Sequence, residues 1–306
     1  TALPTQFFVK FQLQANLPVR LLCEATEAAR IEAHFYNRVA DRLPTSLRAP
    51  RCFFCDHCAA TGEFILLTEL VNFGAARMMP SKHRVRDATT LDEQRLFVQC
   101  GAELNASLWG KHRAAELGLP RYDETRRAFF ALAQVIGVAG LRKTTAKRLV
   151  APNDAFMTWR VPDGLAGHEL ALIRDLPRIL TSLVADRRYS RLVAFGHSDL
   201  FTDNAFVERM AWGELKLGLF DWQQATANNV GQEWAWNFHF LPPEFLTKHE
   251  DELISLVLAT YAKNGKHVAR EDFVRHYVLG CAQMYCFSGG GLQALMGRLD
   301  KAGLLN

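Results

Sequence analysis

The order of strand and helix patterns along the chain limits what it can fold into. Short aromatic and β-branched runs predict strands at residues 7–11, 52–54 and 64–68. Apolar residues at spacings of three and four predict one helix over residues 24–42. From Leu91 onward, helical periodicity dominates. This segregation indicates an α+β fold, with a small antiparallel-sheet lobe that carries one helix and a larger, mainly helical lobe.

The larger lobe is expected to contain helices and one strand-rich island. The helices are predicted at residues 91–109, 124–136, 168–185, 250–263, 271–285 and 292–301, and the strands of the island at residues 191–195, 205–207 and 215–220. We therefore divide the chain into a small lobe at residues 1–71, a connector at 72–90 and a helical lobe at 91–306.

Composition excludes several classes of protein. Hydrophobic residues make up 49% and charged residues 22% of the 306 residues, which is typical of a globular chain and not of a disordered one. The net charge of +4 is too small to indicate a nucleic-acid partner. The longest apolar run, residues 128–141, is shorter than the ~20 residues that span a bilayer. We expect neither nucleic acid nor a membrane as a partner.

The first residues and the cysteines bear on the compartment. The chain begins with Thr1 and not with methionine, so the possibility that it is a processed product or a fragment stays open. No secretory signal pattern is visible in its first residues. Seven cysteines, an odd number, do not suggest a disulfide scaffold. Cys52, Cys55 and Cys58 form a C-x-x-C-x-x-C run, but a closed zinc site needs four ligands. We interpret the run as reduced thiols at a strand turn and expect a cytoplasmic protein.

The densest group of polar residues is His-Ser-Asp-Leu-Phe-Thr-Asp-Asn at residues 197–204, between two predicted strands. Asp199 and Asn204 lie five residues apart in this loop, and Asp221 follows at the end of a later strand. Carboxylate and carboxamide oxygens that converge from neighbouring strand ends suit Mg²⁺, which often takes further ligands from phosphates. The alternative is a simple turn, because Asp and Asn readily bond to their own backbone.

The pattern H-x-D-x-x-x-x-N followed by a strand-borne Asp matches a kinase catalytic loop. Here the sequence resembles the aminoglycoside phosphotransferase and choline kinase-like family, which has a protein-kinase-like fold. It is most similar to the ecdysteroid kinase-like (CHK kinase-like) branch, whose second Asp is followed by Trp or Phe and often by Gln. The resemblance implies that Asp199 is the catalytic group that accepts the proton of the attacking hydroxyl, that His197 fastens this catalytic loop, and that Asn204 and Asp221 bind Mg²⁺.

The same resemblance extends upstream. Lys10, at the end of Phe-Phe-Val-Lys, resembles the strand lysine that contacts the α- and β-phosphates of ATP, and Glu32 resembles the helix carboxylate that holds this lysine. Glu69 and Leu70 resemble the hinge at which backbone groups meet the adenine edge. These four residues are therefore predicted to bind the nucleotide.

Two other glutamates, Glu24 and Glu27, compete with Glu32 as partners of the lysine. Three features depart from the family pattern. Only nine residues precede Lys10, and they contain no glycine-rich hairpin. Ser198 occupies a position where many relatives carry glycine, and Asn105 one where histidine is common.

The function expected from the resemblance is transfer of the γ-phosphate of ATP, with Mg²⁺, to a hydroxyl of a small molecule. Aromatic residues of the helical lobe are candidate walls for this acceptor, although each of them is more often a core residue than a ligand contact: Trp109, Trp234, Trp236, Phe238 and Phe240. A catalytically silent nucleotide-binding module is the alternative, and a protein kinase is less favoured because Asp221 is followed by Trp-Gln-Gln. The acceptor, the choice between ATP and GTP, and the oligomeric state stay open.

Overall fold

The computed structural model describes residues 6–11, 27–71, 90–110, 116–118, 191–200, 202–209, 213, 215–239 and 241–286. The helices predicted at residues 124–136, 168–185 and 292–301 lie outside these ranges, as do the apolar run at 128–141 and nearly all of the connector. Among the described helices, none is both long and apolar enough to cross a membrane.

One sheet and one helix make up the first part of the chain. Strands β1 (Phe7–Phe11), β4 (Phe64–Glu69) and β3 (Cys52–His57) form an antiparallel sheet in the order β1-β4-β3. Helix α2 (Ala28–Arg38) packs against β3 and β4 and is followed by the 3-10 turn η1 (Ala40–Arg42). Register places Lys10 opposite Leu66, so both side chains lie on one face of the sheet.

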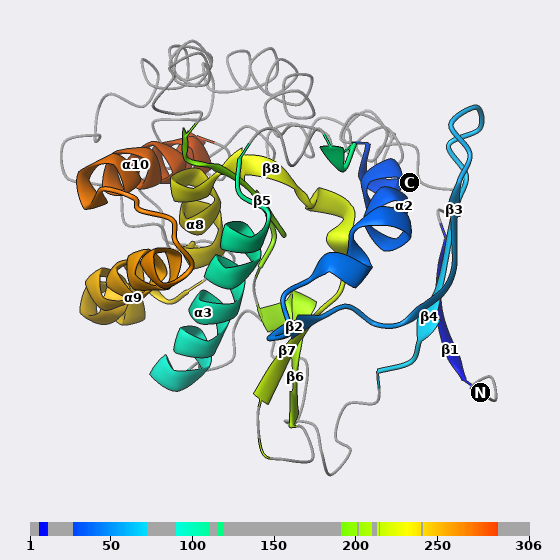
Figure 1. Cartoon of the computed structure of the whole chain (residues 1–306), viewed down its shortest axis with the longest axis horizontal. Coiled ribbons are helices and arrows are strands. Elements are labelled where there is room, and N and C mark those ends of the chain that lie inside the picture. Colours follow the sequence, from blue (N-terminus) through cyan, green and yellow to red (C-terminus); the bar gives the residue numbers. More distant parts are fainter. Residues whose placement is uncertain are drawn as a thin grey trace, which may run out of the picture.

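Two smaller sheets lie at the centre of the molecule (Figure 1). The hairpin of β6 (Ala205–Arg209) and β7 (Leu215–Leu219) is joined by the short strand β2 (Leu47–Arg48), which runs parallel to β7. Strands β5 (Val193–Gly196) and β8 (Thr226–Asn229) pair antiparallel. Two 3-10 turns, η2 (Thr202–Asn204) and η3 (Trp222–Gln224), follow β5 and β7 respectively.

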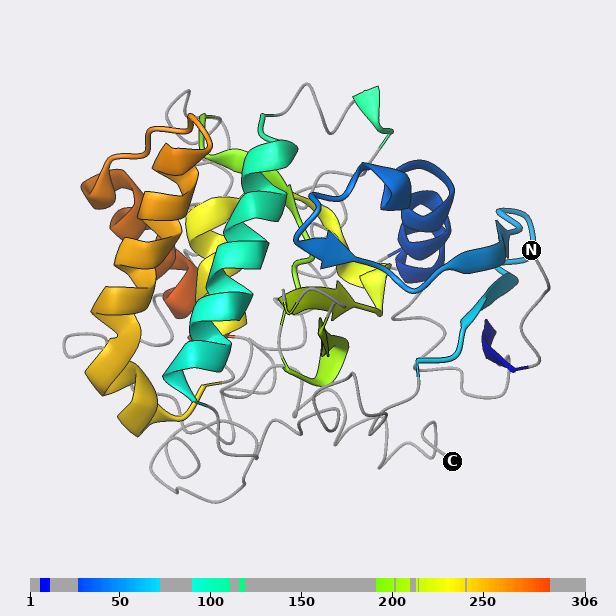
Figure 2. The same cartoon turned by 60° about the horizontal axis from the view of Figure 1, so that its bottom comes forward.

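The remaining described elements are helices. Helix α3 (Leu91–Ser107) begins with a capping box in which Thr90 and Glu93 satisfy each other's backbone N–H. Helix α8 (Val230–Phe238) begins at Asn229, whose side chain accepts bonds from two backbone N–H groups. Helices α9 (Pro243–Lys263) and α10 (Arg270–Cys286) complete the group, with α3 beside α9 and α8 beside α10 (Figure 2).

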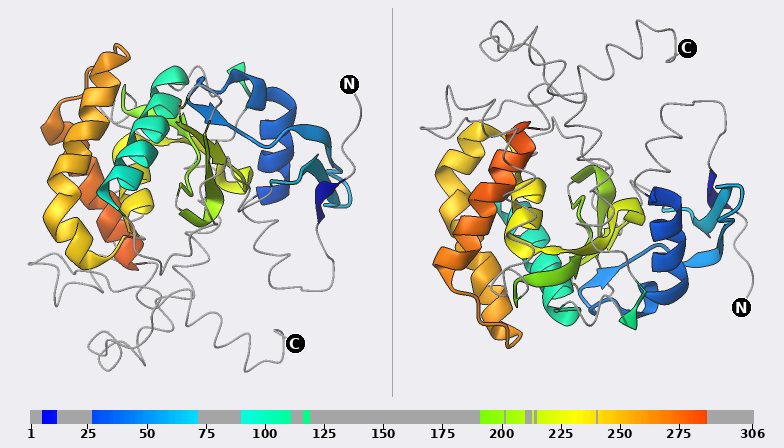
Figure 3. Two further views of the ribbon diagram at one scale, coloured as in Figure 1. Left: turned by 90° about the horizontal axis from the view of Figure 1, so that it is seen from below. Right: turned by 90° about the horizontal axis from the view of Figure 1, so that it is seen from above.

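Aromatic packing joins α2 to the central strands. Phe35 of α2 stacks on Trp222 with ring centroids 3.8 Å apart, and both side chains are fully buried. Phe195 of β5 stacks nearly parallel to Trp222 at 6.4 Å. Both views of Figure 3 show α2 between the β1-β4-β3 sheet and the central strands. Offset ring contacts of this kind add to the free energy gained by burial alone.

The predicted α+β fold is confirmed, with small antiparallel sheets and several helices. The helix predicted at residues 24–42 is shorter, because Glu27 has a left-handed backbone (φ 54°) immediately before α2. Helix α9 begins at Pro243 and not at residue 250, since proline suits the first turn of a helix. Strands β2 and β8 and helix α8 were not predicted. The division at residues 71 and 91 stays a prediction, and the pairing of β2 with β7 connects the two predicted lobes.

Candidate functional site

A partly buried ion cluster forms where the first sheet meets the central strands. Lys10 of β1 places its Nζ 2.8 Å from Glu32 Oε2 and 2.5 Å from Asp221 Oδ1. Glu32 is 1% exposed and also accepts a bond from the backbone N–H of Trp222. Burial alone lowers the pKa of Lys10, but the charges of Glu32 and Asp221 outweigh burial and hold that pKa above its ordinary value. The lysine is therefore a fixed positive charge.

The backbone at Asp221 aims its carboxylate at this lysine. Asp221 has a left-handed conformation (φ 64°, ψ 56°) just after β7, a conformation that Asp and Asn tolerate better than most residues. Gln223 Nε2 donates to Asp221 Oδ2 at 3.2 Å. The backbone N–H of Phe220, the residue before Asp221, donates to the carbonyl of Asn204 at 3.1 Å. This bond brings the backbones of the two predicted metal ligands, Asn204 and Asp221, next to each other.

Both oxygens of the Asp199 carboxylate accept hydrogen bonds. Asn204 Nδ2 donates to Asp199 Oδ2 and to the Asp199 carbonyl, each at 3.0 Å. Trp236 Nε1 donates to Asp199 Oδ1 at 2.9 Å. Because its amide nitrogen is directed at Asp199, the amide oxygen of Asn204 is the atom left to act as a ligand. Asp199 and Asn204 are both buried, so their orientations are held by these contacts.

His197 is a structural group in this loop. The side chain is fully buried, and its Nε2 lies 3.0 Å from the carbonyl of Phe220, to which it donates. Burial lowers the pKa of His197 to about 4, so the ring is neutral at pH 7. The ring also packs on Trp222 at 4.5 Å. Contacts of this kind would fasten the loop, and that role of His197 stays a prediction.

The buried side chain of Glu233 holds the loop of residues 197–204 through a hydrogen bond to its backbone. Glu233 of α8 accepts a bond from the backbone N–H of Ser198 and one from Asn105 Nδ2 at 3.2 Å. Asn105 in turn donates to the carbonyl of Phe195 and accepts from Tyr261. Ser198 has a left-handed backbone (φ 57°), a conformation that glycine adopts more readily than serine. Burial raises the pKa of Glu233 to about 7.

We expect this shift to make stability depend on pH. Between the ordinary value of 4.5 and about 7, the folded chain binds the Glu233 proton more tightly than the unfolded chain does. The contribution of Glu233 to the free energy of unfolding therefore falls as pH rises through that window, by up to about 3 kcal/mol, since one pKa unit is ~1.4 kcal/mol. The lowered pKa of His197 contributes a change of opposite sign over part of the window, so the prediction concerns the difference between the parent and Glu233→Gln at each pH. In Glu233→Gln this fall is absent, as urea unfolding at pH 4.5 and pH 7.5 will show. Glu271→Gln, at the exposed start of α10, is the matched control and keeps the fall. An unchanged slope in Glu233→Gln would contradict the assignment.

Other predicted residues lie apart from the cluster. The carboxylate of Glu69 contacts Arg48 and accepts from the Arg51 backbone N–H at 3.1 Å, and the side chain of Leu70 is exposed. Glu69 and Leu70 thus stay predictions as nucleotide contacts. Of the competing glutamates, Glu27 pairs with Arg30 and not with Lys10, and Glu24 lies outside the described residues.

The candidate acceptor walls divide into core and surface. Trp234 and Phe238 are almost completely buried, so they belong to the core, which is the alternative that the sequence favoured for each of these aromatics. Trp109 is partly buried, and its indole N–H donates to the Arg191 carbonyl at 3.0 Å. Phe240 lies outside the described residues. Trp236 remains, partly exposed and bonded to Asp199.

The cysteine run lies on and just after β3. Cys52 is partly buried, Cys55 buried and Cys58 exposed, and all three are free thiols. Within the part of the chain that the structure describes, no group of three or more His, Cys, Asp or Glu side chains is placed to hold a metal ion. A site built from Asn204 and Asp221 would use the carboxamide oxygen of Asn204 as one ligand. Asparagine is not one of the four residue types that define these groups.

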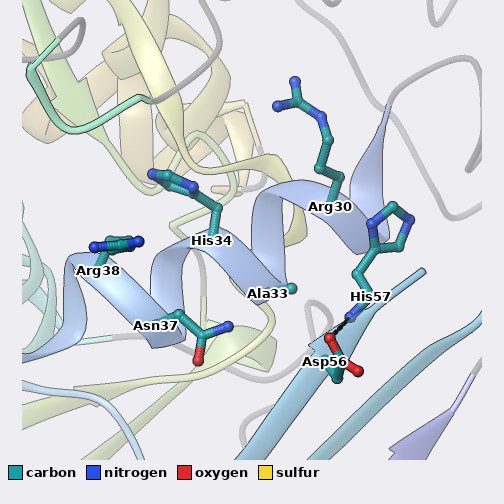
Figure 4. Close-up of a pocket in the computed structure, with 7 residues that line it drawn as sticks. All are labelled: Arg30, Ala33, His34, Asn37, Arg38, Asp56 and His57. Carbon is teal, nitrogen blue, oxygen red and sulfur yellow. Dashed lines mark hydrogen bonds between the residues drawn. The ribbon is translucent and has the colours of Figure 1, made fainter. Parts of the chain in front are cut away.

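A separate open pocket lies between α2 and β3 (Figure 4). Its volume is about 440 Å³, and its lining combines side chains from α2 with Asp56 and His57 of β3. None of the ion-cluster residues lines it. Two of its basic groups are already engaged, because Arg30 pairs with Glu27 and His34 contacts the carbonyl of Leu117.

Sequence reasoning missed the roles of Glu233, Asn105 and Asn237, and it named Trp236 only as an apolar wall. These residues reach the loop from α3 and α8, far from it in the sequence. Asn237 Oδ1, for example, accepts from the Leu200 N–H at 3.1 Å. The one available signal was Asn229, a typical N-cap, which could have predicted α8 and so the face that it presents.

Comparisons with known proteins give only distant similarities. No protein-family model matches the sequence, and no curated protein matches it. Among solved structures, an aminoglycoside 3'-phosphotransferase of type VIII is 20% identical over 90% of this chain and 84% of that one, with a TM-score of 0.46. An ethanolamine kinase from Plasmodium vivax is 14% identical over 94% and 70%, with a TM-score of 0.48. A macrolide 2'-phosphotransferase from Brachybacterium faecium is 17% identical over 97% and 84%, with a TM-score of 0.46.

The structural neighbours are small-molecule phosphotransferases. None of these neighbours bears on the ecdysteroid kinase-like branch, which stays a prediction. At identities of 14% to 20% and TM-scores of 0.46 to 0.48, these similarities do not show what this chain does.

Proposed function

We propose that the protein is an ATP- and Mg²⁺-dependent phosphotransferase that moves the γ-phosphate to a hydroxyl of a small molecule. One observation carries this proposal: Lys10, from the first sheet, meets Asp221 beside the Asp199–Asn204 pair. A fixed ammonium, two carboxylates and a carboxamide are the groups that phosphoryl transfer requires. Lys10 and Asp221, which meet here, are 211 residues apart in the chain.

The donor set fits Mg²⁺. Asp221 offers carboxylate oxygens and Asn204 an amide oxygen, both at strand ends, and these hard oxygen donors are what the ion prefers. Asn204 and Asp221 would hold the ion, and Lys10 would contact phosphate oxygens of the nucleotide. When bound, Mg²⁺ would neutralise negative charge on those phosphates.

The chain's own residues account for the remaining steps. Asp199 accepts the proton of the acceptor hydroxyl and aligns its oxygen with the γ-phosphate. Asn204 and Trp236 fix the Asp199 carboxylate, so little reorganisation is needed in the transition state. Glu32 holds Lys10 in place, and its burial excludes water from the back of the cluster.

Transfer of labelled phosphate tests the proposal. The purified chain is incubated with Mg²⁺ and γ-labelled ATP or GTP, with a panel of amino alcohols, sugars and sterols as acceptors. Nucleotide- and acceptor-dependent appearance of labelled product supports the proposal. Thermal stabilisation by nucleotide with no product from any acceptor would favour a silent nucleotide-binding module. No stabilisation and no product would count against both.

Asp221→Asn is expected to weaken metal use and leave the fold intact. Asn tolerates the left-handed backbone at this position, so the loop is kept while one anionic ligand is lost. We expect the Mg²⁺ concentration for half-maximal rate to rise about tenfold and turnover to fall about 100-fold. A magnesium titration of the initial rate measures both, with the exposed Asp41→Asn as control. Turnover equal to that of the parent would remove Asp221 from the site.

A further inference from the structure

Helix α8 contacts the predicted catalytic loop through one face. Glu233 accepts from the backbone N–H of Ser198, Trp236 donates to Asp199, and Asn237 accepts from the backbone N–H of Leu200. The three residues follow a spacing of three and then one, which places them on neighbouring positions of a single helix face. Three successive loop residues are thus held by three residues of one helix turn.

Among these contacts, only that of Trp236 touches the reactive carboxylate. Its Nε1 lies 2.9 Å from Asp199 Oδ1, while Asn204 occupies Oδ2. Glu233 and Asn237 bind backbone groups and are almost completely buried. Trp236 is partly exposed, so its ring borders the space beside Asp199 as well as the core.

The orientation of the Trp236 ring is itself fixed. His239 packs on the ring edge with centroids 5.1 Å apart, and its Nδ1 contacts the Trp236 carbonyl one helix turn back. A rigid indole has a single N–H donor, which removes one rotational freedom from the carboxylate that accepts it. Because a hydrogen bond to an ionised group is stronger than one between neutral groups, this contact holds Asp199 in one rotamer.

We propose that Trp236 is a positioning residue for phosphate transfer, whose indole N–H sets the orientation of the Asp199 carboxylate toward the acceptor hydroxyl. This inference rests on the proposed function. With Oδ1 held by the indole and Oδ2 by the Asn204 amide, the plane of the carboxylate is defined by two donors on opposite sides. Loss of the indole donor frees the carboxylate to turn and lowers the fraction of bound acceptor that is aligned for transfer.

Trp236→Phe tests this role in the full chain, because it removes the N–H and keeps an aromatic ring. We expect kcat to fall about tenfold, with KM for the nucleotide unchanged, since Lys10 and the metal ligands are not altered. In Asp199→Asn, where no base remains to be oriented, the added Trp236→Phe change should have little further effect on the residual rate. Parent-like kcat in Trp236→Phe, or fully additive losses in the double variant, would overturn the role.

A spectroscopic measurement tests the contact without any activity. In protein labelled with ¹⁵N-indole tryptophan, the signal that vanishes in Trp236→Phe is that of Trp236. Asp199→Asn should shift this signal more than that of Trp222, whose indole donates to the Leu219 carbonyl at 2.9 Å and serves as the internal control. Equal small shifts of both signals would overturn the contact. If the parent transfers no phosphate to any acceptor, the proposed function and the kinetic role both fail, and the indole signal still decides whether the contact exists.

Discussion

Asp199→Asn is expected to reduce phosphate transfer about 1,000-fold and to leave the protein folded. General-base assistance by a positioned side chain contributes roughly 100- to 10,000-fold to a rate, and an amide cannot accept the hydroxyl proton. The cost in stability should be small, about 1 kcal/mol, because an Asn side chain has the same shape. Its one NH₂ group would face either the Trp236 or the Asn204 donor, so one hydrogen bond is lost.

The measurement is the initial rate with the best acceptor of the panel, together with the melting temperature. Asp251→Asn is the matched control: its carboxylate is exposed and pairs with Arg270, away from the site, so parent-like rates are expected. A residual rate above a tenth of that of the parent would exclude Asp199 as the base. A melting temperature far below that of the parent would mean that Asp199 acts mainly in folding.

Gly196→Ala is expected to cause a large loss of stability, because the loop that holds Asp199 leaves no room for one added methyl group. A Cβ at Gly196 would lie 1.8 Å from Glu233 Oε1 and 2.0 Å from Oε2, well inside contact distance. Glu233 is buried and bonded on both sides, so it cannot move away cheaply. Overpacking of this kind costs about 3 kcal/mol, which corresponds to about 5 °C in melting temperature for a chain of this size. Transfer should fall too, because Ser198 and Asp199 follow directly.

The clash can be relieved from its other side. In the Glu233→Ala background the carboxylate is gone, so adding Gly196→Ala should cost less than half of what it costs in the parent. Thermal unfolding of the two single variants and the double variant measures this difference. Equal costs in both backgrounds would show that the strain arises elsewhere than at the glutamate.

Local patterns were sufficient to predict the parts of the fold and site that depend on short segments. The strand that carries Lys10, the helix that carries Glu32 and the loop from His197 to Asn204 each follow from residue types at fixed spacing. The resemblance paired Lys10 with Glu32, and the structure places the two in contact. The site roles of these residues remain predictions that the variants above will test.

The remaining features depend on contacts between distant segments, which spacing cannot reveal. Helix α8 was not predicted, so the spacing of four that joins the buried Val230, Trp234 and Phe238 was not used to separate the core face from the face toward Asp199. Trp234 and Trp236 are the same residue type two positions apart, yet one is buried and the other borders the site. The hydrogen bonds of Glu233 to Ser198 and Asn105 likewise depend on the packing of α8 against β5 and α3, which the sequence alone does not show.

The stack of Phe35 on Trp222 determines which distances within the ion cluster can change if the β1-β4-β3 sheet moves relative to α2 and η3. Glu32 lies one turn before Phe35 on the same helix, and Asp221 precedes Trp222 directly, so the stack fastens both carboxylates to one rigid body. Lys10 reaches them from a separate sheet through four rotatable methylene groups. A hinging motion of that sheet would therefore lengthen the contacts from Lys10 Nζ to the two carboxylates. The distance between the Glu32 and Asp221 carboxylates would stay the same, because both are attached to the stacked aromatic pair.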